Sequence, residues 1–228
     1  MDATMLFDVP ANPKHPARYT PSLLPVMASM LRGRRRILDP FGGVGGAFAL
    51  EQWVDGAHVE CVEIEPEWCA MHPRTTLGNA LALPWPGDYF DAICTSPTYG
   101  NRMADHHAAK DASHRRTYTH VLGRQLHPDN GGAMQWGDAY RAFHVAAWTE
   151  ARRVLQVGGA FVLNIKNHIR AGKVQPVTEW HIEALTALGF RLQRHERVPT
   201  PSMRYGANSD KRVEYESVIL FTLEGKGA

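Results

Sequence analysis

Residues 37–46, which read I-L-D-P-F-G-G-V-G-G, constrain the fold of this chain more than any other stretch. An apolar strand end runs into Asp39 and Pro40, and four glycines follow within five positions. Glycine is needed where a backbone turns tightly, adopts a positive φ or approaches a ligand closely. A strand that opens through such a loop into a helix typically builds a nucleotide site. The stretch therefore predicts an α/β fold, and Asp39 puts a carboxylate at the mouth of the site, which suits a ligand with positive charge.

The order of predicted elements supports this fold class. Apolar runs predict seven strands, and helical spacing or start and stop signals predict helices between most of them. The strands are expected at residues 36–39, 58–65, 75–77, 90–95, 160–165, 190–198 and 214–223, and the helices at 21–31, 46–53, 67–71, 137–154 and 174–188. Strands that alternate with helices indicate a mostly parallel sheet, and we expect the last strand to return antiparallel.

Composition places the chain among ordinary globular proteins. It has 228 residues, of which 44% are hydrophobic and 21% charged. We expect a single domain over residues 1–228, with an N-terminal arm at 1–19 and insertions at 100–136 and 199–213. The formal net charge of +2 neither demonstrates nor opposes binding to a polyanion. Without an apolar run of membrane-spanning length or a signal pattern, we expect a cytoplasmic protein with no membrane partner.

The cysteines and histidines do not indicate a metal site. Cys61 and Cys94 lie in apolar runs that predict buried strands, Cys69 is the third cysteine, and no C-x-x-C spacing occurs. Buried thiols in a reducing compartment explain them best. Residues 103–136 are rich in histidine and aspartate, but their spacings match no recognised ligand pattern. We therefore expect no metal.

A second group of candidate site residues follows the predicted strand at 90–95, which leads into T-S-P-T-Y-G-N-R. Pro97 directly after a central strand stops the ladder and fixes the backbone. Ser96 and Tyr99 then project from the carboxyl edge of the sheet, where open α/β sheets hold their ligands. His144, on the predicted helix at 137–154, is expected to be a packing residue.

Two further strand ends carry polar candidates. The second strand ends in V-E-I-E-P, and an acidic residue there can accept both ribose hydroxyls of an adenosine. We choose Glu63 for this role, with Glu65 as the alternative. Asn79 follows the third strand, on the rim where an adenine edge is read.

Two long basic loops are expected to flank the same edge. Together with their aromatic residues they form a reasonable footprint for a phosphate-bearing polymer, although a solvated loop would look similar. The candidate nucleic-acid-binding residues are Asn101, Arg102, Arg115, Arg116, Arg204, Lys211 and Arg212.

Three segments together resemble the class I S-adenosylmethionine-dependent methyltransferases, and within them the amino-methyltransferases of DNA. These segments are D-P-F-G-G-V-G-G, V-E-I-E-P and T-S-P-T-Y. K-H-P-A-R-Y-T, at residues 14–20, also resembles the family motif that closes over the methionine end of the cofactor. The resemblance covers most of the chain. It implies a Rossmann-like seven-stranded methyltransferase sheet with helices on both faces, S-adenosyl-L-methionine as cofactor, and DNA methylation of the restriction-modification type.

The resemblance also assigns roles to individual positions. The cofactor-binding residues would be Asp39, Pro40, Phe41, Gly43, Gly45, Glu63, Asn79, His15 and Thr20, and the catalytic residues Ser96, Pro97 and Tyr99. The chain departs from the family pattern at two positions. Thr98 stands where a second proline is usual, and Asn79 stands where an aspartate is common.

These residue types suit methyl transfer to an exocyclic amine. The Ser96 hydroxyl and the Pro97 carbonyl can accept both N–H bonds of an exocyclic amine as it attacks the methyl group. Tyr99 can stack on a base that has left the helix. Methylation at cytosine C5 is disfavoured because Cys94 lies inside the strand, before the proline. We expect cytosine-N4 ahead of adenine-N6, with an RNA base (guanine-N2 or adenine-N6) as the alternative, and a monomer or homodimer.

Two other readings remain open. A dinucleotide-dependent oxidoreductase uses a similar loop, but the third glycine of G-x-G-x-x-G would fall at Phe48. The other interpretation is a catalytically weak nucleic-acid-binding homologue, which Thr98 suggests because it replaces the usual second proline.

Overall fold

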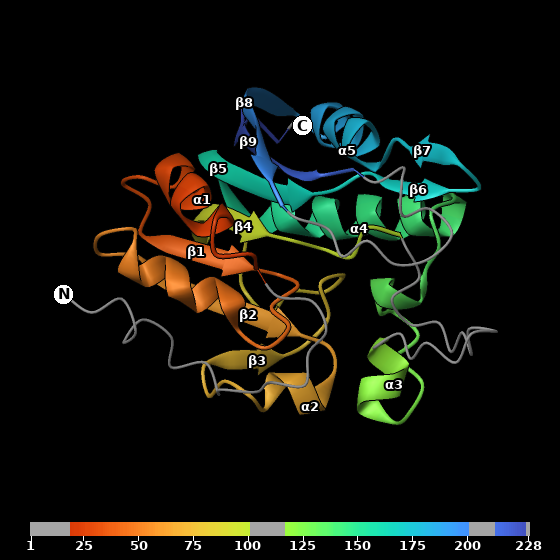
Figure 1. The fold of residues 1–228 in the computed structure, drawn as a ribbon. Helices are drawn as coiled ribbons and strands as arrows, with labels where there is room; N and C mark the ends of the chain where they lie inside the picture. Colours follow the sequence, from red (N-terminus) through yellow and green to blue (C-terminus); the bar gives the residue numbers. More distant parts are fainter. Residues whose placement is uncertain (1–18, 101–116, 201–212, 227–228) are drawn as a thin grey trace.

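The computed structural model describes residues 19–100, 117–200 and 213–226. At its centre lies a seven-stranded sheet in the order β3-β2-β1-β4-β5-β9-β8 (Figure 1). The strands are β1 (Arg36–Asp39), β2 (His58–Glu63), β3 (Thr75–Leu77), β4 (Phe90–Thr95), β5 (Leu155–Ile165), β8 (Phe190–Pro199) and β9 (Tyr215–Leu223). The first five pair in parallel, whereas β9 runs antiparallel to both β5 and β8. The predicted fold class is confirmed.

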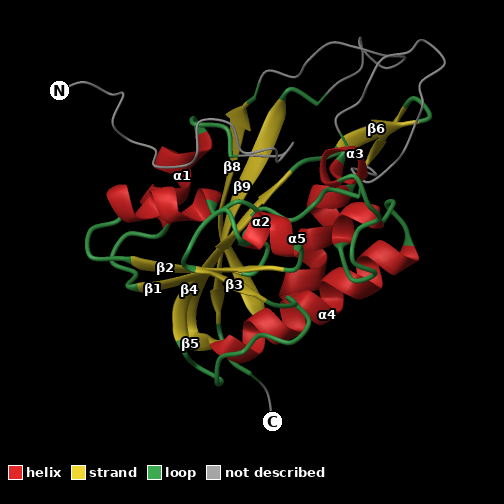
Figure 2. Ribbon diagram, turned by 90° about the horizontal axis from the view of Figure 1, so that it is seen from below, coloured by secondary structure: helices red, strands yellow, loops and turns green. Residues whose placement is uncertain are grey.

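Helices cover both faces of this sheet (Figure 2). They are α1 (Leu23–Met30), η2 (Gly46–Gln52), α2 (Pro66–Cys69), α3 (Tyr118–Leu122), η3 (Gly131–Ala133), α4 (Asp138–Val154) and α5 (Val177–Ala187). Successive residues of a strand point to opposite faces, so Ile37 packs with α1 and η2 while Leu38 packs with α4 and α5. Both faces of β1 and β4 are therefore buried, which explains their continuous apolar sequences.

Four local features differ from the sequence expectation. The helix after the glycine loop, η2, is a 3₁₀ helix. The strand expected at 160–165 begins at Leu155, directly after α4. The helix expected from residue 174 begins at Val177, because β6 (His168–Arg170) and β7 (Lys173–Gln175) form a hairpin before it. Its two turn residues, Ala171 and Gly172, both have positive φ, as tight hairpin turns require. Residues 117–136, which lack periodicity in the sequence, contain α3 and η3.

The structure also shows where the cysteines and the candidate site lie. Cys61 and Cys94 are fully buried free thiols, as predicted for strand residues, and Cys69 is half-buried. No helix in the described part of the chain is long and apolar enough to cross a membrane. Because β1, β2, β4 and β5 are parallel, their carboxyl ends meet at one edge of the sheet, and the candidate site lies there.

Candidate active site

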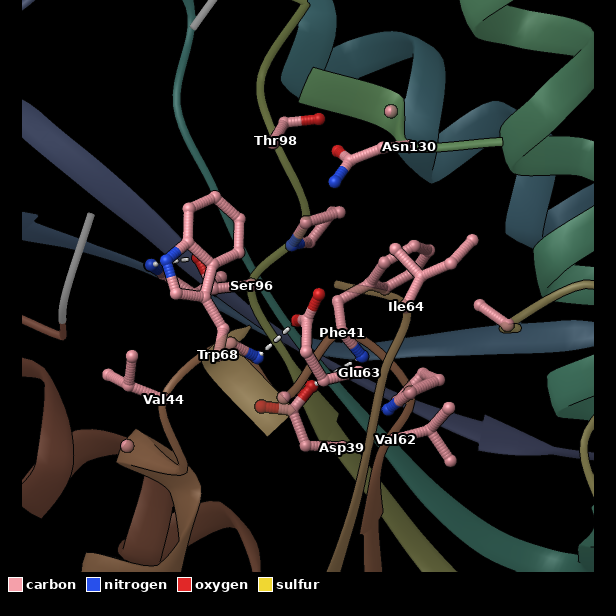
Figure 3. A pocket seen from close by; sticks show the side chains of 18 of the residues that line it. Asp39, Phe41, Val44, Val62, Glu63, Ile64, Trp68, Ser96, Thr98 and Asn130 are labelled. Atoms are coloured by element: carbon pink, nitrogen blue, oxygen red, sulfur yellow. Dashed lines mark hydrogen bonds between the residues drawn. The ribbon is translucent and has the colours of Figure 1, made fainter. Parts of the chain in front are cut away.

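A cavity of about 520 Å³ opens at the carboxyl ends of β1, β2 and β4. Figure 3 shows Asp39 and Glu63 on adjoining strand ends, with Thr98 and Asn130 farther along its wall. The predicted site residues that line it are Asp39, Pro40, Phe41, Gly43, Glu63, Asn79, Ser96, Pro97 and Tyr99. Gly45 and Thr20 do not line it. His15 and all seven candidate nucleic-acid-binding residues lie outside the described residues, so their roles stay predictions.

The glycine loop folds tightly against the end of β2. The Gly42 N–H donates to the Val62 carbonyl at 2.7 Å. A Cβ at Gly42 would lie 2.7 Å from the Cβ of Cys61, closer than side chains approach one another. Gly45 has a φ of 85°, in the left-handed region that favours glycine. The glycines are therefore needed to hold this loop against the sheet.

Asp39 anchors the start of the loop. Its carboxylate accepts hydrogen bonds from the Thr95 hydroxyl at 2.7 Å, the Phe41 N–H at 3.0 Å and the Tyr19 hydroxyl at 3.1 Å. Burial raises the pKa of Asp39 to about 6, although these hydrogen bonds act in the opposite direction. We expected this carboxylate at the mouth of the site, but it is only 1% exposed and lies in the wall of the pocket.

The two acidic residues at the end of β2 have different surroundings. Glu63 lines the pocket, and its two oxygens accept the N–H groups of Gly43 and Glu65, each at 2.8 Å. A carboxylate has about four lone-pair sites, so Glu63 keeps acceptor capacity for a ligand. Burial is the main cause that raises the pKa of Glu63 to about 7. Glu65 instead faces Arg124 at 2.7 Å and accepts the Asn130 side-chain amide at 2.8 Å. Only Glu63 is available to a ligand in the pocket.

Asn79 is paired with a residue that the sequence did not indicate. Its amide nitrogen donates to the Asp129 carboxylate at 2.8 Å, and its oxygen accepts the Leu81 N–H at 2.9 Å. Asp129 also lines the pocket. Asn79 is therefore held by an aspartate from the long insertion. No sequence signal identifies this pair, because 50 residues separate its members.

Ser96 and Tyr99 belong to a polar network with two residues that sequence reasoning missed, Asn164 and Glu216. The Ser96 Oγ lies 3.0 Å from the Tyr99 hydroxyl, which donates to the Glu216 carboxylate at 3.0 Å. The Asn164 amide nitrogen lies 3.1 Å from the Ser96 Oγ, 3.1 Å from the Tyr99 hydroxyl and 2.8 Å from Glu216. All four residues line the pocket.

The hydrogens of this network have one consistent order. The Tyr99 hydrogen points to Glu216, so toward Ser96 the Tyr99 oxygen is an acceptor and the Ser96 hydroxyl donates to it. Ser96 also accepts an N–H from Asn164, and one lone pair remains on its oxygen. Burial and the nearby Glu216 charge raise the pKa of Tyr99 well above its ordinary value, which keeps its proton in place. A ligand in the pocket therefore meets Ser96 as a hydrogen-bond acceptor.

The backbone at Thr98 is held by a buried chain of hydrogen bonds. The Tyr140 hydroxyl donates to the Thr98 carbonyl at 2.8 Å and lies 2.9 Å from Nε2 of His181. The indole N–H of Trp148 donates to Nδ1 of His181 at 3.0 Å, so the neutral ring carries its hydrogen on Nε2. Burial lowers the pKa of His181 well below its ordinary value, which keeps the ring neutral. The position that lacks the usual second proline is thus fixed by tertiary contacts.

An aromatic cluster supports the apolar wall of the pocket. Phe41 lies with its ring centroid 6.1 Å from that of Phe143 and 5.8 Å from that of Trp148. His144 is fully buried beside them, contacts the Tyr140 carbonyl through Nδ1 at 2.9 Å, and has its pKa lowered to about 4 by burial. His144 is a packing histidine, as predicted. Within the described residues, no group of three or more His, Cys, Asp and Glu side chains forms a metal site.

No protein-family model matches the sequence, and no curated protein matches it significantly. Solved structures do match. TrmN from Thermus thermophilus is 17% identical with a TM-score of 0.52, over 87% of this chain and 48% of that chain. The [4+2]-cyclase SpnF is 16% identical with a TM-score of 0.54, over 93% and 85%.

Geranyl diphosphate C-methyltransferase from Streptomyces coelicolor A3(2) was solved with S-adenosyl-L-homocysteine. It is 13% identical with a TM-score of 0.56, over 89% of this chain and 78% of that chain. At such identities the likeness concerns the fold, and the chain has the class I S-adenosylmethionine-dependent methyltransferase fold. Because one of the three neighbours is a cyclase, the reaction has to be argued from the site itself.

Proposed function

We propose that this protein uses S-adenosyl-L-methionine to methylate an exocyclic amine of a DNA base, with cytosine-N4 ahead of adenine-N6. DNA is then its partner, and the protein acts as a monomer or homodimer. An RNA base, methylated at guanine-N2 or adenine-N6, is the alternative substrate. The fold, the three sequence motifs and the polarity of Ser96 support this proposal.

The pocket suits the cofactor in volume and in polar groups. Its volume of about 520 Å³ falls within the range of roughly 300–1,000 Å³ that small-molecule sites occupy. Gly43 leaves no side chain beside Glu63, whose carboxylate is the acceptor that two ribose hydroxyls need. Asp129, held by Asn79, offers an acceptor to an adenine amine. When bound, S-adenosylmethionine supplies a methyl group on a positively charged sulfur, which an amine can attack.

The observation that carries the proposal is the acceptor character of Ser96. The network that includes Tyr99 and Asn164 uses the Ser96 hydrogen internally and leaves an oxygen lone pair for the pocket. The Pro97 carbonyl is an acceptor as well, because every carbonyl is. We propose that this carbonyl acts as the second acceptor beside Ser96, and two such acceptors select a group that donates two hydrogen bonds. An exocyclic amine is such a group.

The same two acceptors favour the reaction as well as binding. The lone pair of an exocyclic amine is delocalised into its ring, so the amine is a weak nucleophile. Hydrogen bonds from its N–H groups to Ser96 and Pro97 favour a pyramidal nitrogen whose lone pair is released for attack. Most of the rate enhancement comes from alignment of the reacting atoms, and no covalent intermediate with the protein is needed.

Transfer of radioactive methyl groups from labelled S-adenosylmethionine tests the proposal. Unmethylated DNA and total RNA serve as separate substrates, and digestion followed by chromatography identifies the modified base. We expect label in DNA, as N4-methylcytosine. Label only in RNA would transfer the proposal to the alternative substrate.

Calorimetry separates this proposal from a dinucleotide-dependent enzyme. We expect S-adenosylmethionine and S-adenosylhomocysteine to bind and NAD to show no binding. Tight binding of NAD without binding of either sulfur compound would reject the proposal. Cofactor binding without transfer to DNA or RNA would instead favour the catalytically weak homologue.

A further inference from the structure

Glu216 belongs to the pocket although no sequence motif includes it. It lies at the start of β9, where it pairs with Val198 of β8, and its side chain reaches the ends of β4 and β5. One oxygen, Oε2, accepts hydrogen bonds from both Tyr99 and Asn164. The residue is half-buried and lines the pocket.

The proposed reaction leaves one proton that needs an acceptor. An amine that gains a methyl group carries a positive charge until one of its N–H hydrogens is removed. Ser96 is within reach of that hydrogen, but a hydroxyl oxygen is too weak a base to keep it. Of the residues joined to Ser96 in the network, Glu216 alone is a carboxylate.

We propose that Ser96, Tyr99 and Glu216 form a proton relay in which Glu216 is the final acceptor. The N–H bond of the methylated amine breaks as its hydrogen passes to the Ser96 oxygen. The Ser96 hydrogen moves to the Tyr99 oxygen, and the Tyr99 hydrogen moves to Glu216. Two O–H bonds break and three form, so the net change is the loss of one amine proton and the gain of one on Glu216.

Asn164 positions this relay without carrying protons. Its amide nitrogen lies within 3.1 Å of Ser96, Tyr99 and Glu216, which holds the three residues at hydrogen-bonding distance. β5 places it there, because Leu163 pairs with Thr95, the residue before Ser96, in the ladder between β5 and β4. Its own oxygen is buried without a hydrogen-bond partner among the described residues.

Other charged groups on the neighbouring elements have partners of their own. Lys166, after β5, contacts the Thr200 hydroxyl at 3.1 Å. On β8, Arg197 lies over the Tyr215 ring at 4.9 Å, and His195 contacts the Ser217 hydroxyl at 2.9 Å. Each of these three groups therefore contacts a residue other than Glu216.

The relay rests on the proposed function, so the experiment measures methyl transfer by the wild type as well as by variants of the relay. Single-turnover methyl transfer to unmethylated DNA and to RNA is followed with saturating cofactor at one fixed pH. The variants are Glu216→Gln, Tyr99→Phe and the double variant. Gln keeps the size of the side chain and an oxygen that accepts hydrogen bonds, but it cannot take up a proton. Glu224→Gln is the matched control, since Glu224 follows the opposite end of β9 and pairs with Arg191 on the surface.

We expect Glu216→Gln and Tyr99→Phe each to lower the rate about 100-fold, the lower end of what general base catalysis contributes. The double variant should be at most about threefold slower than either single variant, because each substitution breaks the same relay. Glu224→Gln should behave as wild type, and all variants should bind S-adenosylhomocysteine normally.

A spectroscopic measurement provides a readout that does not depend on turnover. The infrared bands of the Tyr99 phenol report whether its hydroxyl donates to a carboxylate, and we expect them to shift in Glu216→Gln. An unchanged spectrum would overturn the relay. So would a Glu216→Gln rate within threefold of wild type, or rate losses that multiply in the double variant. In those cases wild-type transfer still supports the proposed function. No transfer by the wild type to DNA or RNA would overturn both.

Discussion

The two halves of the pocket are built in different ways. In the cofactor half, Asp39 and Glu63 bind backbone groups of the glycine loop and of their own strand ends, at most 20 residues away. In the substrate half, Tyr99 meets Glu216 across 117 residues, and Ser96 meets Asn164 across 68. The first half depends mainly on backbone groups, although Thr95 also donates to Asp39 across 56 residues. The second half is a set of side chains that the sheet order brings together.

This difference predicts how each half of the pocket responds to a substitution. A backbone site should lose its shape when a single atom is added where the chain passes too closely. A side-chain site should keep its shape and lose function one hydrogen bond at a time. Four predictions of changed stability, cofactor affinity or transfer rate test this contrast, and they are given in order of decreasing size.

Gly42→Ala should be the most damaging change. The added Cβ would lie 2.7 Å from the Cβ of Cys61 and 3.1 Å from the Val62 carbonyl, and both belong to a buried strand that cannot yield easily. We expect a loss of about 2–4 kcal/mol in the free energy of unfolding, as for overpacked cores, measured by chemical denaturation. Affinity for S-adenosylhomocysteine should fall at least 100-fold.

Gly225→Ala is the control for that substitution, because a Cβ at Gly225 meets no atom within 4 Å. It should leave both stability and affinity near those of the wild type. If Gly42→Ala were as stable as Gly225→Ala, the loop would not depend on close backbone approach, and the contrast between the two halves would fail.

Tyr140→Phe should test the anchor of the substrate half. It removes the hydrogen bond to the Thr98 carbonyl, which we expect to be worth about 1.4 kcal/mol, or tenfold in the rate of methyl transfer. Cofactor affinity should not change. Adding Thr98→Pro should restore most of the rate, because proline fixes the backbone by covalent means.

This rescue distinguishes an anchor from general damage to the core. No hydrogen bond from the Thr98 N–H is present among the described residues, so proline would remove no such bond there. Loss of stability in Tyr140→Phe, where His181 also loses a partner, is measured separately by denaturation. If Thr98→Pro failed to raise the rate of Tyr140→Phe, Tyr140 would act through the packing of its neighbours instead.

The same contrast explains what the sequence predicted. The glycine loop, Glu63 and the Ser96-Pro97 turn were found because local sequence determines strand ends and tight turns. The mostly parallel character of the sheet also followed from the alternation of strands and helices. Asp129, Asn164 and Glu216 were missed, since each acts through a partner at least 50 residues away. The hairpin at residues 168–175 was missed because its strands are only three residues long.

The affinity for S-adenosylhomocysteine should depend on pH through Glu63. This compound lacks the positive charge of the cofactor, so it isolates the ribose contact from the charge of Asp39. The pKa of Glu63 is about 7, so protonation between pH 8 and pH 6 removes the ionised acceptor. We expect the dissociation constant to rise about tenfold over that range. Glu63→Gln should bind more weakly and show no such dependence.

Stability of the free protein should change in the opposite direction. Because folding raises the pKa of Glu63 from 4.5 to about 7, the protonated form stabilises the fold. That contribution is complete below pH 4.5 and is lost as the pH rises through 7. Glu63→Gln should reduce this pH dependence in urea denaturation. If affinity and stability rose together with pH, Glu63 would not be the titrating group.

Asp129→Asn should have the smallest effect on cofactor affinity, and it tests whether the insertion contributes to the cofactor half. Asp129 brings a long-range contact from the insertion into the cofactor half, through its hydrogen bond with Asn79. Removing its charge should lower affinity for S-adenosylhomocysteine about fivefold, equivalent to about 1 kcal/mol, the value of an ordinary hydrogen bond. Asp138→Asn, at the exposed start of α4, is the control. An unchanged affinity would mean that the cofactor half is closed by its own strand ends, whereas a loss would mean that the insertion helps to close it.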